Sequence, residues 1–235
     1  MKVLVIGATG KIGKRVLKSL AKTHQVTALI RYPELQAEYE KMGAHVLTVD
    51  VETELEKKVH EATSGQDAVI IAATAGADGS STEIELLDRN VAMNAIDAAK
   101  KERVRHVVLL SAYGADQPNA APKELFNFLS ANNAADEYIE HSGLNYTIIC
   151  PVTIVDEPSK GSIEASEDLS DADGATISET DVATVIAASL DNRGLYGRRI
   201  EIKSGSTPIN EALDFEGRGE VANGGRTTLR RPQRS

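Results

Sequence analysis

The chain has 235 residues, of which 41% are apolar and 26% are charged, and its formal net charge is −9. This length suffices for a large hydrophobic core, and the composition excludes collagen-like and globally disordered proteins. The negative charge argues against a nucleic-acid partner, and the absence of a long apolar run argues against a membrane-spanning segment. The single cysteine excludes an internal disulfide, which fits a reducing compartment. We therefore expect a cytoplasmic protein.

Apolar, β-prone runs alternate with segments of helical periodicity from the first residue onward. Strands are predicted at residues 2–6, 25–30, 45–49, 68–73, 106–111, 146–151 and 199–202. Nearly all are continuous apolar runs, which is typical of strands covered on both faces. The sequence therefore predicts an α/β fold with a doubly wound, mostly parallel sheet of the Rossmann type, in one domain over residues 1–215 with a small C-terminal elaboration.

Several helix starts can be predicted from local signals. Pro33 suits the first position of a helix, and residues 53–56, 80–83 and 178–181 have the spacing of a capping box or a near match to it. A long helix is predicted over residues 83–101. Its apolar positions suit packing on the sheet or against a second subunit, so homodimerisation stays open; they are Ile84, Leu87, Val91 and Ile96.

The composition changes to Ser, Asp, Glu and Gly between Asp156 and Asp181. We expect residues 153–180 to form a variable, irregular loop on the substrate side, where a lid is often found. Acidic residues in this segment lack the order of a calcium-binding loop and predict a solvated surface; they are Glu164, Glu167, Asp168, Asp171 and Asp173. Residues 216–235 are rich in arginine without an apolar period, which predicts a disordered tail; whether that tail is native stays open.

The strongest chemical signal is the run Gly7-Ala8-Thr9-Gly10-Lys11-Ile12-Gly13, between an apolar strand and an amphipathic segment. Glycine allows a tight turn and close approach of a pyrophosphate to the backbone, and the helix start offers free N–H groups to phosphate. In this setting the run predicts a dinucleotide site, with Thr9 and the backbone of Gly10 through Ile12 at the phosphates.

The end of the second predicted strand indicates which dinucleotide is bound. A carboxylate there would accept a hydrogen bond from the ribose of NAD, whereas an arginine suits the additional phosphate of NADP. The chain has Arg31 at this position, which favours NADP(H) over NAD(H).

Several of these segments together resemble a known family. They are residues 7–13, Ile30-Arg31, Val49-Asp50-Val51, Ser111-Ala112-Tyr113 and residues 142–151. Over residues 1–213 the chain resembles the atypical short-chain dehydrogenase/reductases, and within them the NAD(P)H-binding group that includes NmrA-like proteins and biliverdin/flavin reductases.

This resemblance implies further cofactor contacts. Asp50 and Val51 would contact the adenine, Ala72, Ala73 and Thr74 would run beside the cofactor, and Pro151 and Val152 would border the nicotinamide. Ordinary structural roles stay open for these residues: Asp50 could cap a loop, and Pro151 could end a strand.

The usual proton-donating pair of short-chain reductases, a tyrosine followed four residues later by a lysine, is absent from the chain. Alignment with the family places Phe128 at the tyrosine position and Asn132 at the lysine position. Asn132 can still hydrogen-bond a ribose, but phenylalanine has no proton to give. Simple ketone reduction would therefore be slow.

Three interpretations remain. In the first, hydride passes from NADPH to a flavin, a quinone or a similar conjugated acceptor, with Ser111 hydrogen-bonding this small-molecule substrate. In the second, Tyr113 replaces the missing phenol. In the third, which the NmrA-like resemblance permits, the protein is a regulator that binds NADP(H) without turnover.

Neither the histidines nor Cys150 indicate a metal or a nucleophile. The five histidines show no ligand spacing, so no metal site is predicted. His106 starts an apolar strand and is interpreted as a packing residue, and Cys150 as an inert core thiol.

Overall fold

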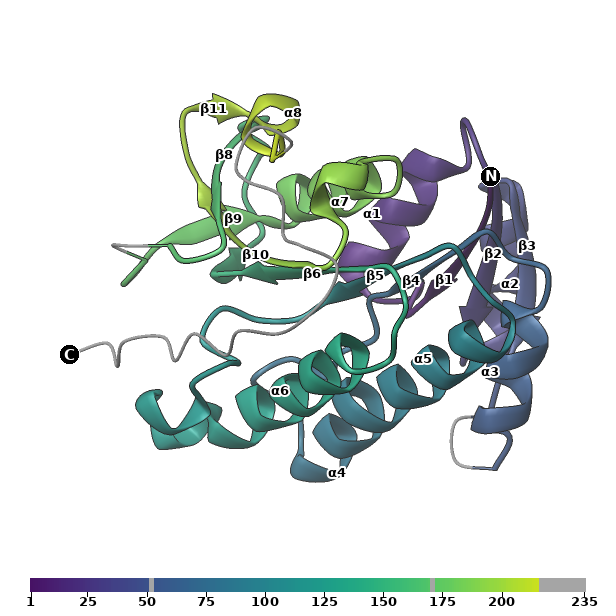
Figure 1. Ribbon diagram of the computed structural model, residues 1–235. Helices are drawn as coiled ribbons and strands as arrows, with labels where there is room; N and C mark the ends of the chain where they lie inside the picture. The colour runs from purple at the N-terminus through teal and green to yellow at the C-terminus, as the bar shows by residue number, and fades with distance from the viewer. Residues whose placement is uncertain (51–52, 170–171, 216–235) are drawn as a thin grey trace.

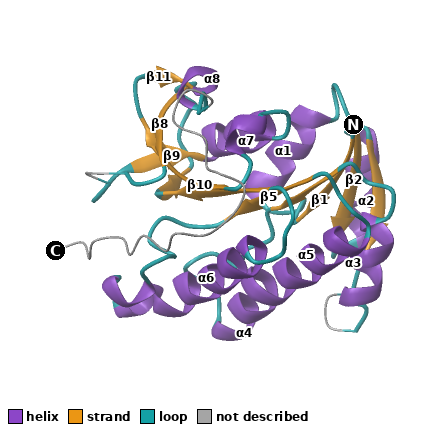
Figure 2. Ribbon diagram, viewed as in Figure 1, coloured by secondary structure: helices purple, strands orange, loops and turns teal. Residues whose placement is uncertain are grey.

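A nine-stranded sheet forms the middle layer of the computed structural model, which describes residues 1–50, 53–169 and 172–215 (Figures 1 and 2). The strand order is β11-β8-β10-β6-β5-β4-β1-β2-β3, and all strands from β3 to β10 in this order are parallel. The strands are β1 (Lys2–Ile6), β2 (Gln25–Ile30), β3 (Ala44–Thr48), β4 (Ala68–Ile71), β5 (His106–Leu110), β6 (Tyr146–Pro151), β8 (Ser162–Ser166), β10 (Arg198–Ser204) and β11 (Thr207–Pro208). The predicted α/β class is thus confirmed, and β1, β2 and β6 have their predicted bounds.

Helices cover both faces of the sheet, because alternate residues of each strand enter different cores. Val3 and Val5 of β1 pack in one apolar cluster, and Leu4 and Ile6 pack in the other. One face carries α1 (Lys11–Leu20), α2 (Gln36–Lys41) and α7 (Glu179–Ser189). The opposite face carries α3 (Leu55–Thr63), α4 (Ser81–Ile84), the π-helical segment η2 (Glu85–Val91), α5 (Ala92–Lys101) and α6 (Phe126–Glu140) (Figure 1). Short helical turns are η1 (Pro33–Leu35), η3 (Pro118–Ala120), η4 (Lys123–Leu125), η5 (Arg193–Leu195) and α8 (Ile209–Ala212).

Helices begin within all three of the predicted start segments, and two of these starts have the side-chain cap that the spacing predicts. Ser80 and Glu83 form a capping box, and the Ser178 hydroxyl accepts the Asp181 N–H at 3.0 Å. Pro33 is the first residue of η1, as predicted. At residues 53–56, however, α3 begins at Leu55 after Glu54, with no side-chain cap on that described helix end.

The segment at residues 153–180 is more regular than predicted. It contains β8 and the strands β7 (Thr153–Val155) and β9 (Thr176–Ser178), which pair in a small separate sheet. Strand β8 alternates between the buried residues Ile163 and Ala165 and more exposed neighbours, and it pairs antiparallel with β10. Such a short alternation among polar residues gives little signal in sequence. Asp171 and the predicted tail at 216–235 lie outside the described residues.

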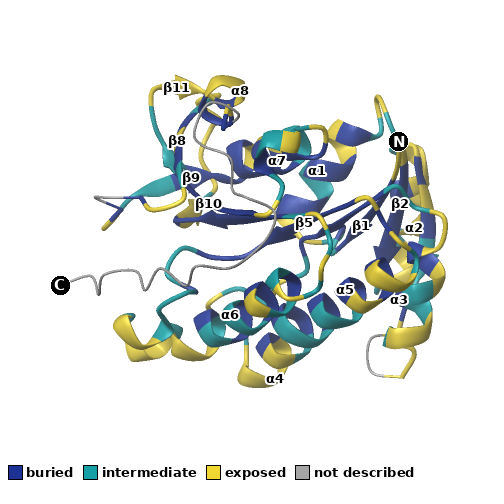
Figure 3. Cartoon of the chain, viewed as in Figure 1, coloured by how far each residue is buried: buried dark blue, intermediate teal, exposed yellow. Residues whose placement is uncertain are grey.

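The predicted long helix is a continuous run from α4 through η2 to α5. Its apolar residues Ile84, Leu87, Val91 and Ile96 are all buried within the chain. Figure 3 shows buried, dark blue stretches along α5. The seven residues of η2 are π-helical, a geometry that is often found at functional sites. None of the described helices is long and apolar enough to cross a lipid bilayer.

Candidate cofactor and active site

The glycine-rich turn between β1 and α1 packs closely against the chain that follows β4. Gly7 has a φ of +83°, and a Cβ on it would lie 2.4 Å from the Ala73 nitrogen. A Cβ on Gly13 would lie 2.2 Å from the Gly7 carbonyl oxygen. Both positions therefore require glycine, for the turn and for close contact between the helix and the strand.

The start of α1 is open to a ligand. Gly10 is the N-cap residue, and no side chain of the described residues caps this helix end. No acidic residue lies in the first turn. The first N–H groups of a helix have no partner within the helix, and its dipole favours an anion. These features fit the pyrophosphate of a dinucleotide.

A cleft of about 440 Å³ extends from this turn along the carboxyl ends of β1, β2 and β4. Nine residues that the sequence predicted for the cofactor line it; they are Gly7, Thr9, Gly10, Lys11, Ile12, Arg31, Ala72, Ala73 and Thr74. Apolar side chains form much of the remaining wall, among them Leu29, Val49, Leu55, Leu87 and Val91. An apolar wall with a few polar groups suits a nucleotide.

The other described residues that the sequence predicted for the cofactor lie outside the lining of this cleft. Gly13 is buried beneath the glycine turn, and Asp50 is exposed after β3. Pro151, Val152 and Asn132 are buried. Val51 lies outside the described residues.

Arg31 lies at the end of β2, where the sequence places it. Its guanidinium carbon is 5.2 Å from the centre of the neighbouring Tyr32 ring, and both residues line the cleft. A permanently charged guanidinium group therefore borders the cleft at this end of the sheet.

A buried carboxylate holds the loop after β4, which borders the cleft. Asp88 of η2 accepts hydrogen bonds from the Thr74 hydroxyl, from the Ala75 N–H at 2.8 Å and from the Asn132 amide at 3.4 Å. Asn132 also donates to the Phe128 carbonyl at 2.9 Å. Burial raises the pKa of Asp88, and these hydrogen bonds oppose the rise. Asn132, which the resemblance places at the family's lysine position, thus contacts a group that shapes the cleft.

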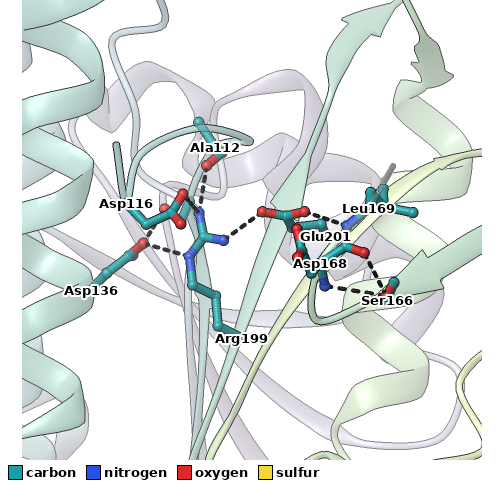
Figure 4. Close-up of polar contacts among 9 residues, drawn as sticks. Ala112, Asp116, Asp136, Ser166, Asp168, Leu169, Arg199 and Glu201 are labelled. Carbon is teal, nitrogen blue, oxygen red and sulfur yellow. Dashed lines mark hydrogen bonds and ion pairs between the residues drawn. The ribbon is translucent and has the colours of Figure 1, made fainter. Parts of the chain in front are cut away.

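Ser111 belongs to a second buried polar group, on the α6 side of the sheet. Its hydroxyl donates to Asp136 of α6 at 2.8 Å. Arg199 of β10 contacts Asp136 at 3.5 Å, Glu201 at 2.9 Å and Asp116 at 3.4 Å, and donates to the Ala112 carbonyl at 3.1 Å (Figure 4). We call Ser111, Asp116, Asp136, Arg199 and Glu201 the Arg199 cluster.

Tyr113, the other predicted catalytic residue, lies just beyond Ser111 and is partly buried against the apolar core. Its backbone N–H donates to the Pro151 carbonyl at 2.9 Å, so the chain after β5 is joined to the end of β6. Neither Ser111 nor Tyr113 lines the cleft described above.

Comparison with known proteins agrees with this geometry. A model of the NAD(P)H-binding family matches residues 7–193 of the chain.

The chain belongs to the NAD(P)H-binding family.

A Bacillus subtilis protein named as an uncharacterized sugar epimerase, YhfK, is 34% identical over 215 residues, which cover 91% of this chain and 99% of the relative. A solved structure titled a putative NAD-dependent epimerase/dehydratase, from Bacillus halodurans, has a TM-score of 0.84 at 31% identity and covers 91% of this chain and 98% of its own. The oxidoreductase ylbE from Lactococcus lactis has a TM-score of 0.78 at 29% identity, with 91% and 95% covered. The predicted membership of the atypical short-chain dehydrogenase/reductases is thus confirmed.

One charged residue in the cleft of this family member was not predicted. Glu179, the first residue of α7, lines the cleft and is almost buried. Its carboxylate lies 3.0 Å from Lys11 Nζ and 2.7 Å from Arg15 Nη2, both on the first turns of α1. These ion pairs connect the start of α7 with the predicted phosphate site.

Sequence reasoning also missed Asp88, Asp136 and Arg199. A signal existed for two of them. Asp136 follows Phe128 and Asn132 at spacings of four residues, which places all three on one face of a helix. Arg199 and Glu201 alternate with isoleucines in a strand, so both point to the same face of the sheet.

The interpretations of His106 and Cys150 agree with the structure. His106 Nε2 lies 2.9 Å from the Thr147 hydroxyl, its ring is 4.3 Å from that of Tyr196, and burial lowers its pKa to about 4. Burial raises the pKa of the Cys150 thiol, which disfavours the nucleophilic thiolate. Among the described residues no group of side chains has the arrangement of a metal site.

Proposed function

We propose that the protein is an NADP(H)-dependent reductase that transfers hydride from NADPH to a flavin, a quinone or a similar conjugated acceptor. The observation that carries this proposal is the position of Arg31, which lines the cleft at the end of β2. A permanently charged guanidinium group there can bind the phosphate that distinguishes NADP from NAD.

The residues of the chain would hold the cofactor in a definite order. Arg31 would hold the phosphate of the adenosine ribose, and the glycine turn with the α1 N-terminus would hold the pyrophosphate. The loop from Ala72 to Thr74 would guide the remainder toward the ends of β5 and β6. When bound, NADPH supplies a hydride at its nicotinamide.

The acceptor class follows from what replaces the usual catalytic pair. By the resemblance, Phe128 and Asn132 stand at the positions at which a tyrosine and a lysine would move a proton. Without that pair, reduction of an ordinary ketone loses a general acid, an effect of about 100- to 10,000-fold. A sugar epimerase reaction, which the name of one similar protein suggests, would likewise lack this proton-transferring pair. A conjugated acceptor accepts hydride with less help.

Cofactor preference is tested by fluorescence titration with NADPH and NADH. We expect the wild type to bind NADPH more tightly, and Arg31→Ala to weaken NADPH binding by about 10- to 100-fold while leaving NADH binding little changed. Lys14→Ala is a matched control, because it removes a positive charge that pairs with Glu38 and does not line the cleft. Equal affinity of the wild type for both dinucleotides would overturn the NADP(H) assignment.

Turnover is tested by NADPH oxidation with FMN, FAD and menadione as acceptors. We expect NADPH consumption with at least one of them. Tight NADPH binding without consumption would contradict the reductase proposal. That result would instead support a regulator that responds to NADP(H), the alternative left open by the sequence.

A further inference from the structure

The Arg199 cluster contains more negative than positive charge in a buried position. Three carboxylates, of Asp116, Asp136 and Glu201, surround one guanidinium group. The Asp136 side chain is 4% exposed and that of Glu201 is 0% exposed. The Asp116 side chain is 23% exposed, but the two buried carboxylates alone outnumber the guanidinium group. Keeping both of them ionised is electrostatically costly, so the cluster favours holding a proton.

Asp136 is the member best suited to hold that proton. Its Oδ2 accepts the Ser111 hydroxyl, whereas its buried Oδ1 has no hydrogen-bond partner among the described residues. An ionised carboxylate with an unpaired buried oxygen is unfavourable, because burial costs the charged form more than the neutral carboxyl group. Glu201, in contrast, is held by Arg199 and by the Leu169 N–H at 2.8 Å.

Ser111 connects Asp136 with the edge of the sheet at which the cofactor cleft opens. In the register of β4 and β5, Ile71 is level with Leu109. Ala73, which lines the cleft, follows the end of β4, and Ser111 follows the end of the neighbouring parallel strand β5, so both residues lie at the same edge of the sheet. The Ser111 hydroxyl, at this edge of the sheet, is hydrogen-bonded to the side chain of Asp136.

We propose that Asp136 and Ser111 form a proton relay, in which Asp136 holds a proton and the Ser111 hydroxyl delivers one to the reduced acceptor. This inference rests on the proposed reductase function and adds the proton source that Phe128 cannot provide. Ser111 is the catalytic residue of the pair. Asp136 acts through it and is a positioning residue that also restores its proton.

The relay balances atoms and charge. A conjugated acceptor of the flavin or quinone class gains two electrons and one hydrogen as hydride from NADPH, which is oxidised, and becomes an anion. In the transfer the Ser111 hydroxyl turns toward the anion and gives it a proton, and the 2.8 Å hydrogen bond is reversed, so that protonated Asp136 Oδ2 donates its proton to Ser111 Oγ. Asp136 is left as a carboxylate beside Arg199, and a proton from water later restores it.

The charged groups around Asp136 set the pH range in which Asp136 holds its proton. Burial raises the pKa of Asp136 to about 7, with opposition from Arg199 and from the Ser111 hydrogen bond and a further rise from Glu140. Cys150 lies in the same buried region and has a raised pKa of its own, which leaves its thiol neutral. Asp116 and Glu201, bound to Arg199, complete the set.

The protonation of Asp136 can be measured without cofactor or acceptor. In protein labelled with ¹³C at the aspartate carboxyl carbon, we expect one resonance to titrate near pH 7, where Asp136 has its pKa. That resonance should be absent from Asp136→Asn. In Asp116→Asn, which removes a nearby negative charge, it should titrate at a lower pH. A titration of Asp136 near the ordinary aspartate value of about 4 would overturn the relay.

Activity provides the second measurement, with NADPH and menadione from about pH 5 to pH 9. We expect wild-type kcat to fall as pH rises through the midpoint found by NMR, because the relay then loses its proton. Asp116→Asn should shift this fall and the NMR midpoint together to lower pH. Ser111→Ala and Asp136→Asn should lower kcat at pH 6 by about 100-fold and abolish its pH dependence, with the Kd of NADPH unchanged.

The outcomes separate the relay from the reductase itself. Turnover in which Ser111→Ala keeps the wild-type rate and pH profile would overturn the relay and leave the reductase proposal intact. NADPH binding without turnover by the wild type would overturn both. If Asp136→Asn does not fold, Ser111→Ala and Asp116→Asn decide the question, since both retain the Asp136 carboxyl group.

Discussion

The N–H of Ala75, in a loop that lines the cofactor cleft, donates to the carboxylate of Asp88 in the π-helical segment at 2.8 Å. The same carboxylate accepts the Thr74 hydroxyl. The loop after β4 therefore takes its shape from a side chain on another element. The π-helical segment, a geometry often found at functional sites, thus carries a side chain that holds a loop of the cleft.

Replacement of Asp88 should consequently weaken cofactor binding. In Asp88→Asn an N–H₂ group replaces one acceptor oxygen where three donors converge, so one donor loses its partner. We expect the Kd of NADPH to rise by about 10-fold. Asp97→Asn is the matched control, because Asp97 accepts the Tyr138 hydroxyl on the exposed side of α5. Unchanged NADPH binding in Asp88→Asn would show that the loop keeps its shape without this contact.

The glycine turn predicts a contrast between two substitutions three residues apart. A Cβ at residue 13 would lie 2.2 Å from the Gly7 carbonyl oxygen, whereas one at residue 10 would lie 3.4 Å from the same atom. Gly13→Ala should lower the free energy of unfolding by about 1–3 kcal/mol, because the backbone must shift. Gly10→Ala should change it by less than about 1 kcal/mol. Urea denaturation measures both, and equal stability of the two variants would contradict the predicted clash.

The parallel core and the cofactor turn could be predicted because each is encoded locally. The continuous apolar run of β1 and the glycines after it identify both features without reference to the rest of the chain. Arg31 could be placed because it directly follows β2. To predict these features, only the sequence of one strand and of the residues after it is needed.

The polar contacts that complete the site could not be predicted, because they join residues far apart in sequence. Ser111 and Asp136 are 25 residues apart, and Arg199 is 63 residues from Asp136. Glu179 reaches Lys11 from α7 across the fold. Strands β7, β8 and β9 were not predicted for a related reason. Each is short, and its extended conformation depends on hydrogen bonds to a partner strand elsewhere in the sequence.

Glu179 should oppose cofactor binding through its charge. Its carboxylate lines the cleft and pairs with Lys11 and Arg15, close to the expected pyrophosphate. Glu179→Gln removes this negative charge and frees both cations, so the Kd of NADPH should fall several-fold, and more at low salt. Asp156→Asn is the control, because Asp156 is 72% exposed and lies 3.6 Å from Arg15; we expect little change there. Weaker binding in Glu179→Gln would mean that Glu179 positions the cations for phosphate.

The raised pKa of Asp136 predicts how stability changes with pH. An aspartate in an unfolded chain titrates near about 4, whereas burial raises the pKa of Asp136 to about 7 in the folded protein. Between these values the folded state binds the additional proton, so this residue makes the free energy of unfolding fall as pH rises. His106, whose lowered pKa gives the opposite slope, is present in both wild type and Asp136→Asn, and its contribution cancels in their difference. The melting temperature of wild type minus that of Asp136→Asn should therefore decrease steadily from about pH 4 to pH 7 and then level off. A difference that increases with pH over this range would show that Asp136 is buried as a carboxylate, held by Arg199, and carries no proton at neutral pH.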